Sequence, residues 1–191
     1  MTDQPLRILV LGASLRPGSF NVVLAELAAD VLREAGAEVD LAGFAEFQVP
    51  GYDAGREAEH GVPEGARRFA ERLAAADAFL LVSPEYNASV PGTVKNLVDW
   101  VSRLKPQPFW GHQGLLMSAS PRLTGGNRGL WALRVPLEHL GARMYPEMVS
   151  VAQADTAFTS DGSLADGKQA RRMARTIEGF LDLVSAVVRR P

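Results

Sequence analysis

The sequence contains no cysteine, and this absence removes several kinds of chemistry. Its 191 residues form no disulfide, zinc–thiolate site, iron–sulfur cluster or thiol nucleophile. No apolar run approaches the roughly 20 residues that a membrane span needs. Residues 1–11 lack the basic start and long apolar core of a signal peptide. Any redox activity would therefore depend on a bound organic cofactor, and we expect a cytoplasmic protein.

The chain also lacks an excess of either charge. Its 20 basic and 22 acidic residues give a net charge of -2, which argues against nucleic acid or an anionic membrane as the main partner. The composition, 47% hydrophobic and 22% charged, is typical of one domain of average size. Three scattered histidines, His60, His112 and His139, show no metal-ligand spacing, and we expect them at the surface and no bound metal.

Short aliphatic runs alternate with amphipathic segments along the chain. Strands are predicted at 6–11, 38–42, 77–83, 114–118 and 145–151. Helices are predicted at 22–35, 63–76, 93–104 and 165–190, with a further helical stretch that follows 124–127, ends at 141 and is kinked or split at Pro136. A surface loop is expected at 43–62. This alternation predicts a single α/β domain, residues 1–191, with a doubly wound five-stranded parallel sheet and helices on both faces.

In such a sheet, ligands bind beyond the carboxyl ends of the strands, where the strand order reverses. The loops after the first, third and fourth predicted strands should therefore converge. The first of them, residues 12–21, contains the hydroxyls of Ser14 and Ser19, the guanidinium of Arg16 and two glycines just before a helix. It lacks the lysine of a Walker phosphate-binding loop, the glycine pattern of a dinucleotide-binding loop and the Gly-x-Ser-x-Gly pattern of a nucleophile elbow. This pattern favours a site for a terminal monophosphate, with an ordinary strand-to-helix turn as the alternative.

The second of these loops has the most distinctive sequence in the chain. Residues 83–100 read Ser-Pro-Glu-Tyr-Asn-Ala-Ser-Val-Pro-Gly-Thr-Val-Lys-Asn-Leu-Val-Asp-Trp. Its prolines form a stiff frame, and Tyr86 and Asn87 suit a flat heteroaromatic ligand. Together with Gly-Ala-Ser-Leu-Arg at 12–16 and the following Ser-x-Asn at 19–21, this text resembles the NADPH-dependent FMN reductase family. These are flavodoxin-like enzymes that include quinone, azo-dye and chromate reductases, and the resemblance extends over essentially the whole chain.

The resemblance implies a bound FMN in contact with all three loops. It assigns the FMN phosphate to Ser14, Arg16, Ser19 and Asn21, the flavin ring to Pro84, Glu85, Tyr86 and Asn87, and a third contact to Ser118, Ser120 and Gly125. Flavin N5 would be the reactive centre, with no catalytic side chain. Hydride would pass from NADPH or NADH to FMN and on to quinones, azo compounds, chromate or free flavin. The segment 121–123, Pro-Arg-Leu, departs from the small residues usual there.

The family also implies a homodimer or homotetramer. Two other functions stay open: an FMN-binding electron carrier, and a regulatory flavoprotein without nicotinamide turnover. Such carriers are usually strongly acidic and lack an arginine in the phosphate loop. Glu85 is interpreted as orienting or structural, the residues of the helix after the second loop as capping and packing, and Arg122 and Arg128 as weaker candidates for the adenosine phosphate of NADPH.

Overall fold

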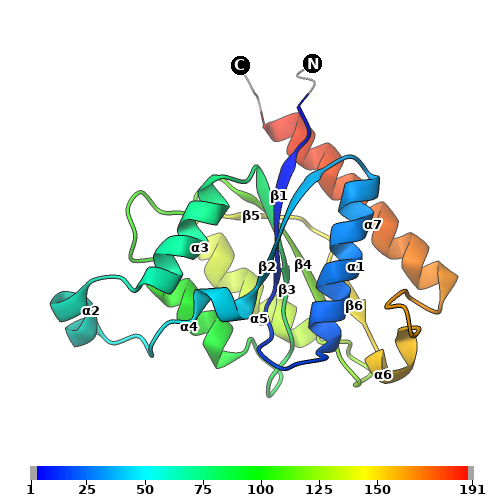
Figure 1. Cartoon of the computed structure of the whole chain (residues 1–191), viewed down its shortest axis with the longest axis horizontal. Helices are drawn as coiled ribbons and strands as arrows, with labels where there is room; N and C mark the ends of the chain where they lie inside the picture. The colour runs from blue at the N-terminus through cyan, green and yellow to red at the C-terminus, as the bar shows by residue number, and fades with distance from the viewer. Residues whose placement is uncertain (1–3, 189–191) are drawn as a thin grey trace.

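Aliphatic runs form the centre of a parallel sheet in the computed structural model, which describes residues 4–188 (Figure 1). The strands are β1 (Arg7–Gly12), β2 (Glu38–Gly43), β3 (Ala78–Val82), β4 (Gln113–Ala119), β5 (Arg143–Met144) and β6 (Val149–Val151). They follow the order β2-β1-β3-β4-β5, and β6 also pairs with β4. This is the order of flavodoxin-like doubly wound sheets. The predicted fold class is confirmed, and the strand order reverses between β1 and β3.

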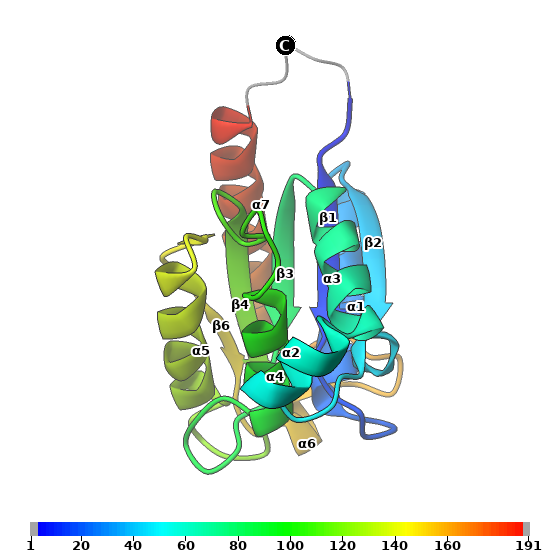
Figure 2. The same ribbon diagram turned by 90° about the vertical axis from the view of Figure 1, so that its left-hand side faces the viewer.

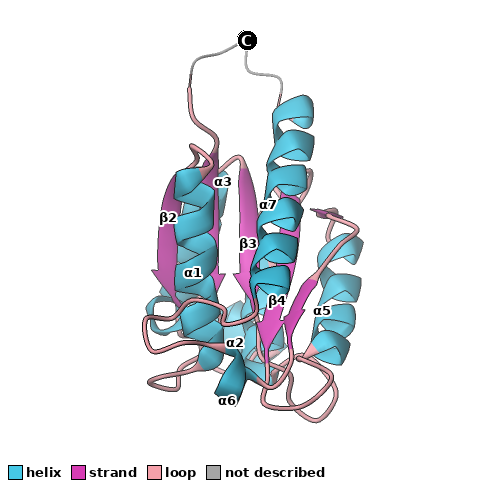
Figure 3. Cartoon of the chain, turned by 90° about the vertical axis from the view of Figure 1, so that its right-hand side faces the viewer, coloured by secondary structure: helices cyan, strands magenta, loops and turns pink. Residues whose placement is uncertain are grey.

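Helices cover both faces of the sheet (Figures 2 and 3). One face carries α1 (Phe20–Glu34) and α7 (Gly167–Val187); the other carries α3 (Glu64–Ala74), α4 (Gly92–Val101) and α5 (Asn127–His139). Alternate residues of each strand point to opposite faces. Ile8 and Val10 of β1 therefore lie in the core beneath α1 and α7, and Leu9 and Leu11 lie in the core beneath α3, α4 and α5. Within residues 4–188, no helix is both long and apolar enough to cross a membrane.

The segment expected as a surface loop, 43–62, lies largely at the surface but is partly helical, so the loop part of that prediction is wrong. It contains the short segments η1 (Phe44–Phe47) and α2 (Ala54–His60). Asn96 of α4 holds it through both ends of its amide: Oδ1 accepts from the Tyr52 N–H at 2.8 Å and Nδ2 donates to the Pro50 carbonyl at 2.9 Å. The indole N–H of Trp100 donates to the same carbonyl at 2.7 Å. As interpreted from the sequence, these two α4 residues pack and pair.

Two predictions about the second half of the chain also need correction. Of the strand expected at 145–151, only the end forms a strand, β6; β5 lies before that range, and Pro146, which has no N–H to donate to a ladder, lies between the two. The helix through Pro136 is not split, because α5 continues from Asn127 to His139. Pro136 lies near its end and still accepts the N–H of Leu140 at 3.0 Å. A proline in the last turns removes only one intrahelical hydrogen bond.

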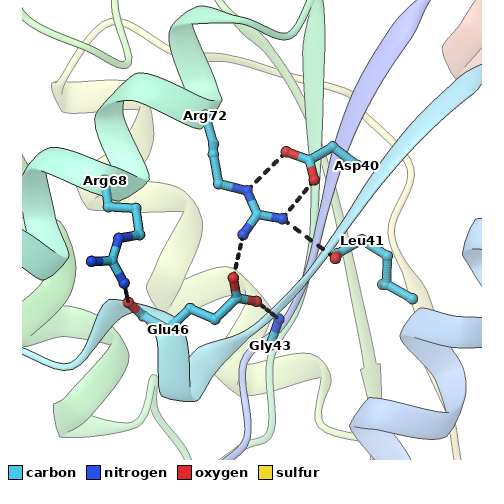
Figure 4. A network of polar contacts seen from close by, with 6 residues as sticks. All are labelled: Asp40, Leu41, Gly43, Glu46, Arg68 and Arg72. Atoms are coloured by element: carbon cyan, nitrogen blue, oxygen red, sulfur yellow. Dashed lines mark hydrogen bonds and ion pairs between the residues drawn. The ribbon is translucent and has the colours of Figure 1, made fainter.

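A network of charges around Arg72 fixes the turn after β2 (Figure 4). The guanidinium binds both carboxylate oxygens of Asp40, at 2.6 and 2.8 Å, and one oxygen of Glu46 at 2.7 Å. The other Glu46 oxygen accepts the N–H of Gly43 at 2.7 Å. Because Arg72 binds both carboxylate oxygens of Asp40, this carboxylate stabilises the end of β2 and the turn after it.

Candidate functional site

The loops after β1, β3 and β4 meet at the carboxyl edge of the sheet, at the lower end of the molecule in Figure 2. The N–H of Ala13 donates to the carbonyl of Val82 at 2.8 Å, and the N–H of Ser83 donates to that of Met117 at 2.9 Å. The N–H of Ser120 donates to Val151 of β6 at 3.0 Å. The expected convergence of these loops is therefore confirmed by backbone hydrogen bonds.

The first loop has the features of an anion site. Ser19 is the N-cap of α1, and its Oγ accepts the N–H of Asn21 at 3.3 Å. Ser14 Oγ accepts the N–H of Arg16 at 3.3 Å. The Arg16 side chain is exposed, and no acidic group within residues 4–188 forms an ion pair with it. An unpaired guanidinium beside the positive end of a helix dipole favours a bound anion.

Asn21 lies in a different place from the other residues assigned to the phosphate. Its side chain is buried, Nδ2 donates to the carbonyl of Ala119 at 2.9 Å, and Oδ1 accepts the N–H of Ala119 at 2.9 Å. Both ends of the amide are thus used by the protein itself. The structure makes Asn21 a clasp between the start of α1 and the end of β4, so it positions the first loop against the third.

The second loop ends in a tight, exposed turn. Tyr86 and Ser89 exchange two backbone hydrogen bonds, both of 3.0 Å, across Asn87 and Ala88 with φ of 51° and 61°. Positive φ at both central residues defines a type I′ turn, which asparagine tolerates better than alanine. The Tyr86 side chain is 55% exposed. The turn therefore presents an aromatic ring and an amide to solvent on a rigid backbone, and backbone strain of this kind is common at ligand-binding loops.

The Glu85 side chain turns toward the start of α5 and caps that helix. One carboxylate oxygen accepts from Nε and Nη2 of Arg128 at 2.9 and 2.6 Å, and the other accepts the N–H groups of Arg128 and Gly129 at 3.0 and 3.3 Å. Burial acts to raise the pKa of Glu85, but the hydrogen bonds and the charge of Arg128 outweigh it and lower that pKa below its ordinary value. Glu85 and Arg128 therefore form an ion pair with each other.

Replacing Glu85 with glutamine should destabilise the protein by about 1–3 kcal/mol at neutral pH, since charge-assisted bonds to a helix N-terminus are lost. The folded-state pKa of Glu85 is lowered, so its contribution is complete above the unfolded pKa of about 4.3 and disappears as pH falls below it. Urea unfolding of both proteins from neutral pH to about pH 3.5 tests this. Glu64→Gln, which removes an exposed ion pair on α3, is the control. A wild-type advantage that does not shrink in acid would refute the assignment.

The third loop contains two adjacent glycines that let it pack closely on the strand ends. Gly125 and Gly126 have φ of 59° and 85°. A Cβ at Gly125 would come within 3.0 Å of the backbone of Val151, and one at Gly126 would overlap the hydroxyl of Ser118. Only glycine therefore lets this loop lie so closely on the ends of β4 and β6.

Two hydroxyls beneath this loop are buried without hydrogen-bond partners. Ser118 is fully buried, and its Oγ has no partner within the described residues; the same holds for the Oγ of Ser150. The two residues are register partners in β4 and β6. Ser120, by contrast, is partly exposed and accepts the N–H of Arg122 at 3.2 Å. Unpaired buried hydroxyls are rare and mark a place where polar atoms of a ligand or of water belong.

The structure thus brings Ser14, Arg16, Ser19, Pro84, Tyr86, Asn87, Ser120 and Gly125 to one edge, and it turns the side chains of Asn21, Glu85 and Ser118 inward. The surface prediction is wrong for His112, which is partly buried; burial lowers its pKa below the ordinary value. Among residues 4–188 no group of three histidine or acidic side chains is placed to hold a metal ion.

Comparisons with known proteins agree with this geometry. Residues 6–156 match the model of the family described as NADPH-dependent FMN reductase. The chain is 33% identical to a quinone reductase of Escherichia coli over 188 residues, covering 97% of this chain and 98% of that one. It is 35% identical over 170 residues to an NAD(P)H-dependent FMN reductase of Pseudomonas aeruginosa, covering 88% and 89%. The structure of FerB, a flavoenzyme NAD(P)H:(acceptor) oxidoreductase from Paracoccus denitrificans, superposes with a TM-score of 0.81 at 28% identity, covering 95% of this chain and 98% of that one.

Proposed function

Because this chain belongs to the NADPH-dependent FMN reductase family, we propose that it transfers electrons from NADPH or NADH through bound FMN to small acceptors. Its class is an NAD(P)H-dependent oxidoreductase of the quinone reductase type, with FMN as cofactor. Quinones are the acceptors that the relatives' names support most directly. Azo compounds, chromate and free flavin are further candidate acceptors.

The residues at the carboxyl edge fit FMN in two respects. The first loop offers an unpaired guanidinium and a helix N-terminus for a phosphate. Two glycines pack the third loop directly on the strand ends, and two buried hydroxyls without partners among the described residues, those of Ser118 and Ser150, lie beneath it. This second observation carries the proposal, because an ordinary strand-to-helix turn has no need of unpaired polar atoms.

We assign the residues of this edge as follows. Arg16, Ser14 and the first turn of α1 behind Ser19 hold the phosphate. The backbone from Pro84 to Asn87 and the ring of Tyr86 lie along one side of the flavin, and the Ser120 to Gly125 segment lies along another. Asn21 and Glu85 act from beneath, by keeping these loops in position, and the unpaired hydroxyl of Ser118 lies under the third loop.

Bound FMN supplies the redox chemistry, accepting two electrons from the nicotinamide and passing them to the acceptor. We assign no proton transfer to Glu85, because its carboxylate is ionised and bound to Arg128. The protein holds the planar groups in place and lets nicotinamide and acceptor reach the same exposed face. Donor and acceptor should therefore bind in turn.

Steady-state kinetics with NADPH and 1,4-benzoquinone test this account. Because one face serves both substrates, double-reciprocal plots at several quinone concentrations should be parallel, as in a ping-pong mechanism. Intersecting lines would contradict the shared face. Tight FMN binding without any turnover of NADPH would instead indicate an electron carrier or a regulatory flavoprotein.

We also propose a cytoplasmic homodimer or homotetramer. Trp131 and Val135 lie one turn apart on α5, and their side chains are 55% and 69% exposed. Large apolar side chains at helical spacing on a solvent face are a common feature of contacts between subunits. Sedimentation of the wild type beside Val135→Glu tests this: the variant should form a smaller species.

A further inference from the structure

A cavity in the described part of the chain lies away from the flavin edge. It has a volume of about 720 Å³ and opens between α3 and the segment that joins α4 to β4. That segment lies at the upper end of the sheet in Figure 2, where the strands begin, and the loops of the candidate site lie at the lower end. A ligand in this cavity would therefore not compete with FMN for space.

The walls of the cavity suit an aromatic molecule. Its apolar lining consists of Ala70, Ala74, Leu104, Pro106, Pro108 and Trp110. The indole of Trp110 packs against the backbone of Gly141, since a Cβ at Gly141 would overlap the ring, and yet the side chain is 74% exposed. An exposed indole held against Gly141, in a cavity that two prolines also line, offers a flat surface on which an aromatic ring stacks. The volume lies within the range of small-molecule sites.

The charges around the cavity favour an anion. Arg67 and Lys105 line it together with one acidic residue, Glu71. The Nε of Arg67 donates to the carbonyl of Val62 at 3.0 Å, which leaves other guanidinium N–H groups for a ligand. Lys105 forms no ion pair within residues 4–188. The excess of positive charge is complementary to a single acidic group on the ligand.

His112 supplies a buried polar group at the same place. It lines the cavity, and its Nδ1 is buried without a hydrogen-bond partner among the described residues. Burial, the largest influence, lowers the pKa of this imidazole, against the backbone groups of Leu73, Pro108 and Ala76, which act to raise it. The imidazole is therefore a neutral, partly buried polar part of the cavity wall.

We propose that this cavity is a second ligand site, which takes a planar aromatic molecule carrying one acidic group. The ring stacks on Trp110 between the prolines, and the acidic group lies toward Lys105 and Arg67. The site is separate from the FMN edge and goes beyond the reductase activity proposed above.

Calorimetric titration of 2-naphthoate into the FMN-loaded protein tests the site. Binding should be saturable at one site per chain and equal with and without FMN. Trp110→Ala should weaken it about tenfold or more, since stacking contributes up to roughly 1.5 kcal/mol beyond the buried area. Lys105→Gln, at an exposed and unpaired side chain, should keep the fold and weaken binding about threefold. FMN binding by each variant confirms that it is folded.

The matched control is Lys168→Gln, which removes an exposed lysine from α7 outside the cavity and should leave the affinity within about twofold. Three results would overturn the proposal: displacement of 2-naphthoate by FMN, equal affinity of the wild type and Trp110→Ala, or absence of saturable binding. A fourth would be a smaller sedimenting species for Trp110→Ala, which would make the cavity a contact between copies of the chain.

Discussion

Replacing Asn21 with alanine is expected to lower the free energy of unfolding by roughly 2–4 kcal/mol, because two buried backbone groups of Ala119 lose their partners together. Water is excluded from this position, so the N–H and the carbonyl of Ala119 would stay unpaired in the folded state. The clasp between α1 and β4 would be lost as well, and FMN affinity should fall although the Asn21 side chain does not face the ligand. Urea unfolding and a flavin titration measure the two effects.

Asn96 provides a matched control for this prediction. Its amide makes the same pair of backbone hydrogen bonds, to Tyr52 and Pro50, but both of those residues are exposed. Water can replace the lost partners there, so Asn96→Ala should cost about 1 kcal/mol and leave FMN affinity unchanged. Equal losses of stability in the two variants would show that burial of the Ala119 groups contributes nothing.

Replacing Arg16 with alanine is expected to weaken FMN binding roughly ten- to one-hundredfold, because a hydrogen bond between charged groups contributes about 1.5–3 kcal/mol. The guanidinium is exposed and unpaired within the described chain, so folding does not depend on it. The thermal midpoint of the apoprotein should therefore not change. Arg16→Lys should recover part of the affinity, since lysine keeps the charge and loses the two-point geometry.

Two further measurements identify the phosphate as the partner of Arg16. Arg33→Ala removes an exposed arginine from the far end of α1 and should leave FMN affinity as it is. Riboflavin, which lacks the phosphate, should bind wild type and Arg16→Ala equally. A tenfold loss of riboflavin affinity in Arg16→Ala would contradict the phosphate assignment and place the guanidinium against the ring.

The fold follows closely from local patterns. Runs such as Ile8 to Leu11 are apolar at every position, which is the pattern of a strand covered on both faces, and glycine or proline marks most helix ends. The errors occur where local and tertiary signals differ. Segment 43–62 is rich in glycine, proline and charge, and part of its order comes from Asn96 and Trp100, which lie far along the chain.

The site was predictable as a set of loops but not as a set of side-chain directions. The carboxyl edge, the phosphate loop and the glycine pair follow from topology and from motif chemistry. Sequence spacing does not show that Asn21 turns to a strand 98 positions away, or that Glu85 binds Arg128 at the start of α5. These polar groups form hydrogen bonds with residues far along the chain, and the order of residues alone does not show which partner each group binds.

Anaerobic reduction of the FMN-loaded protein by NADPH tests the central claim most directly. The protein is mixed with FMN, freed of excess cofactor, and titrated with NADPH while the flavin absorbance is followed. We predict that FMN remains bound and that its absorbance is lost at one equivalent of NADPH per flavin. Bound FMN whose absorbance NADPH does not change would contradict the reductase assignment, and failure of the protein to retain any flavin would contradict the site itself.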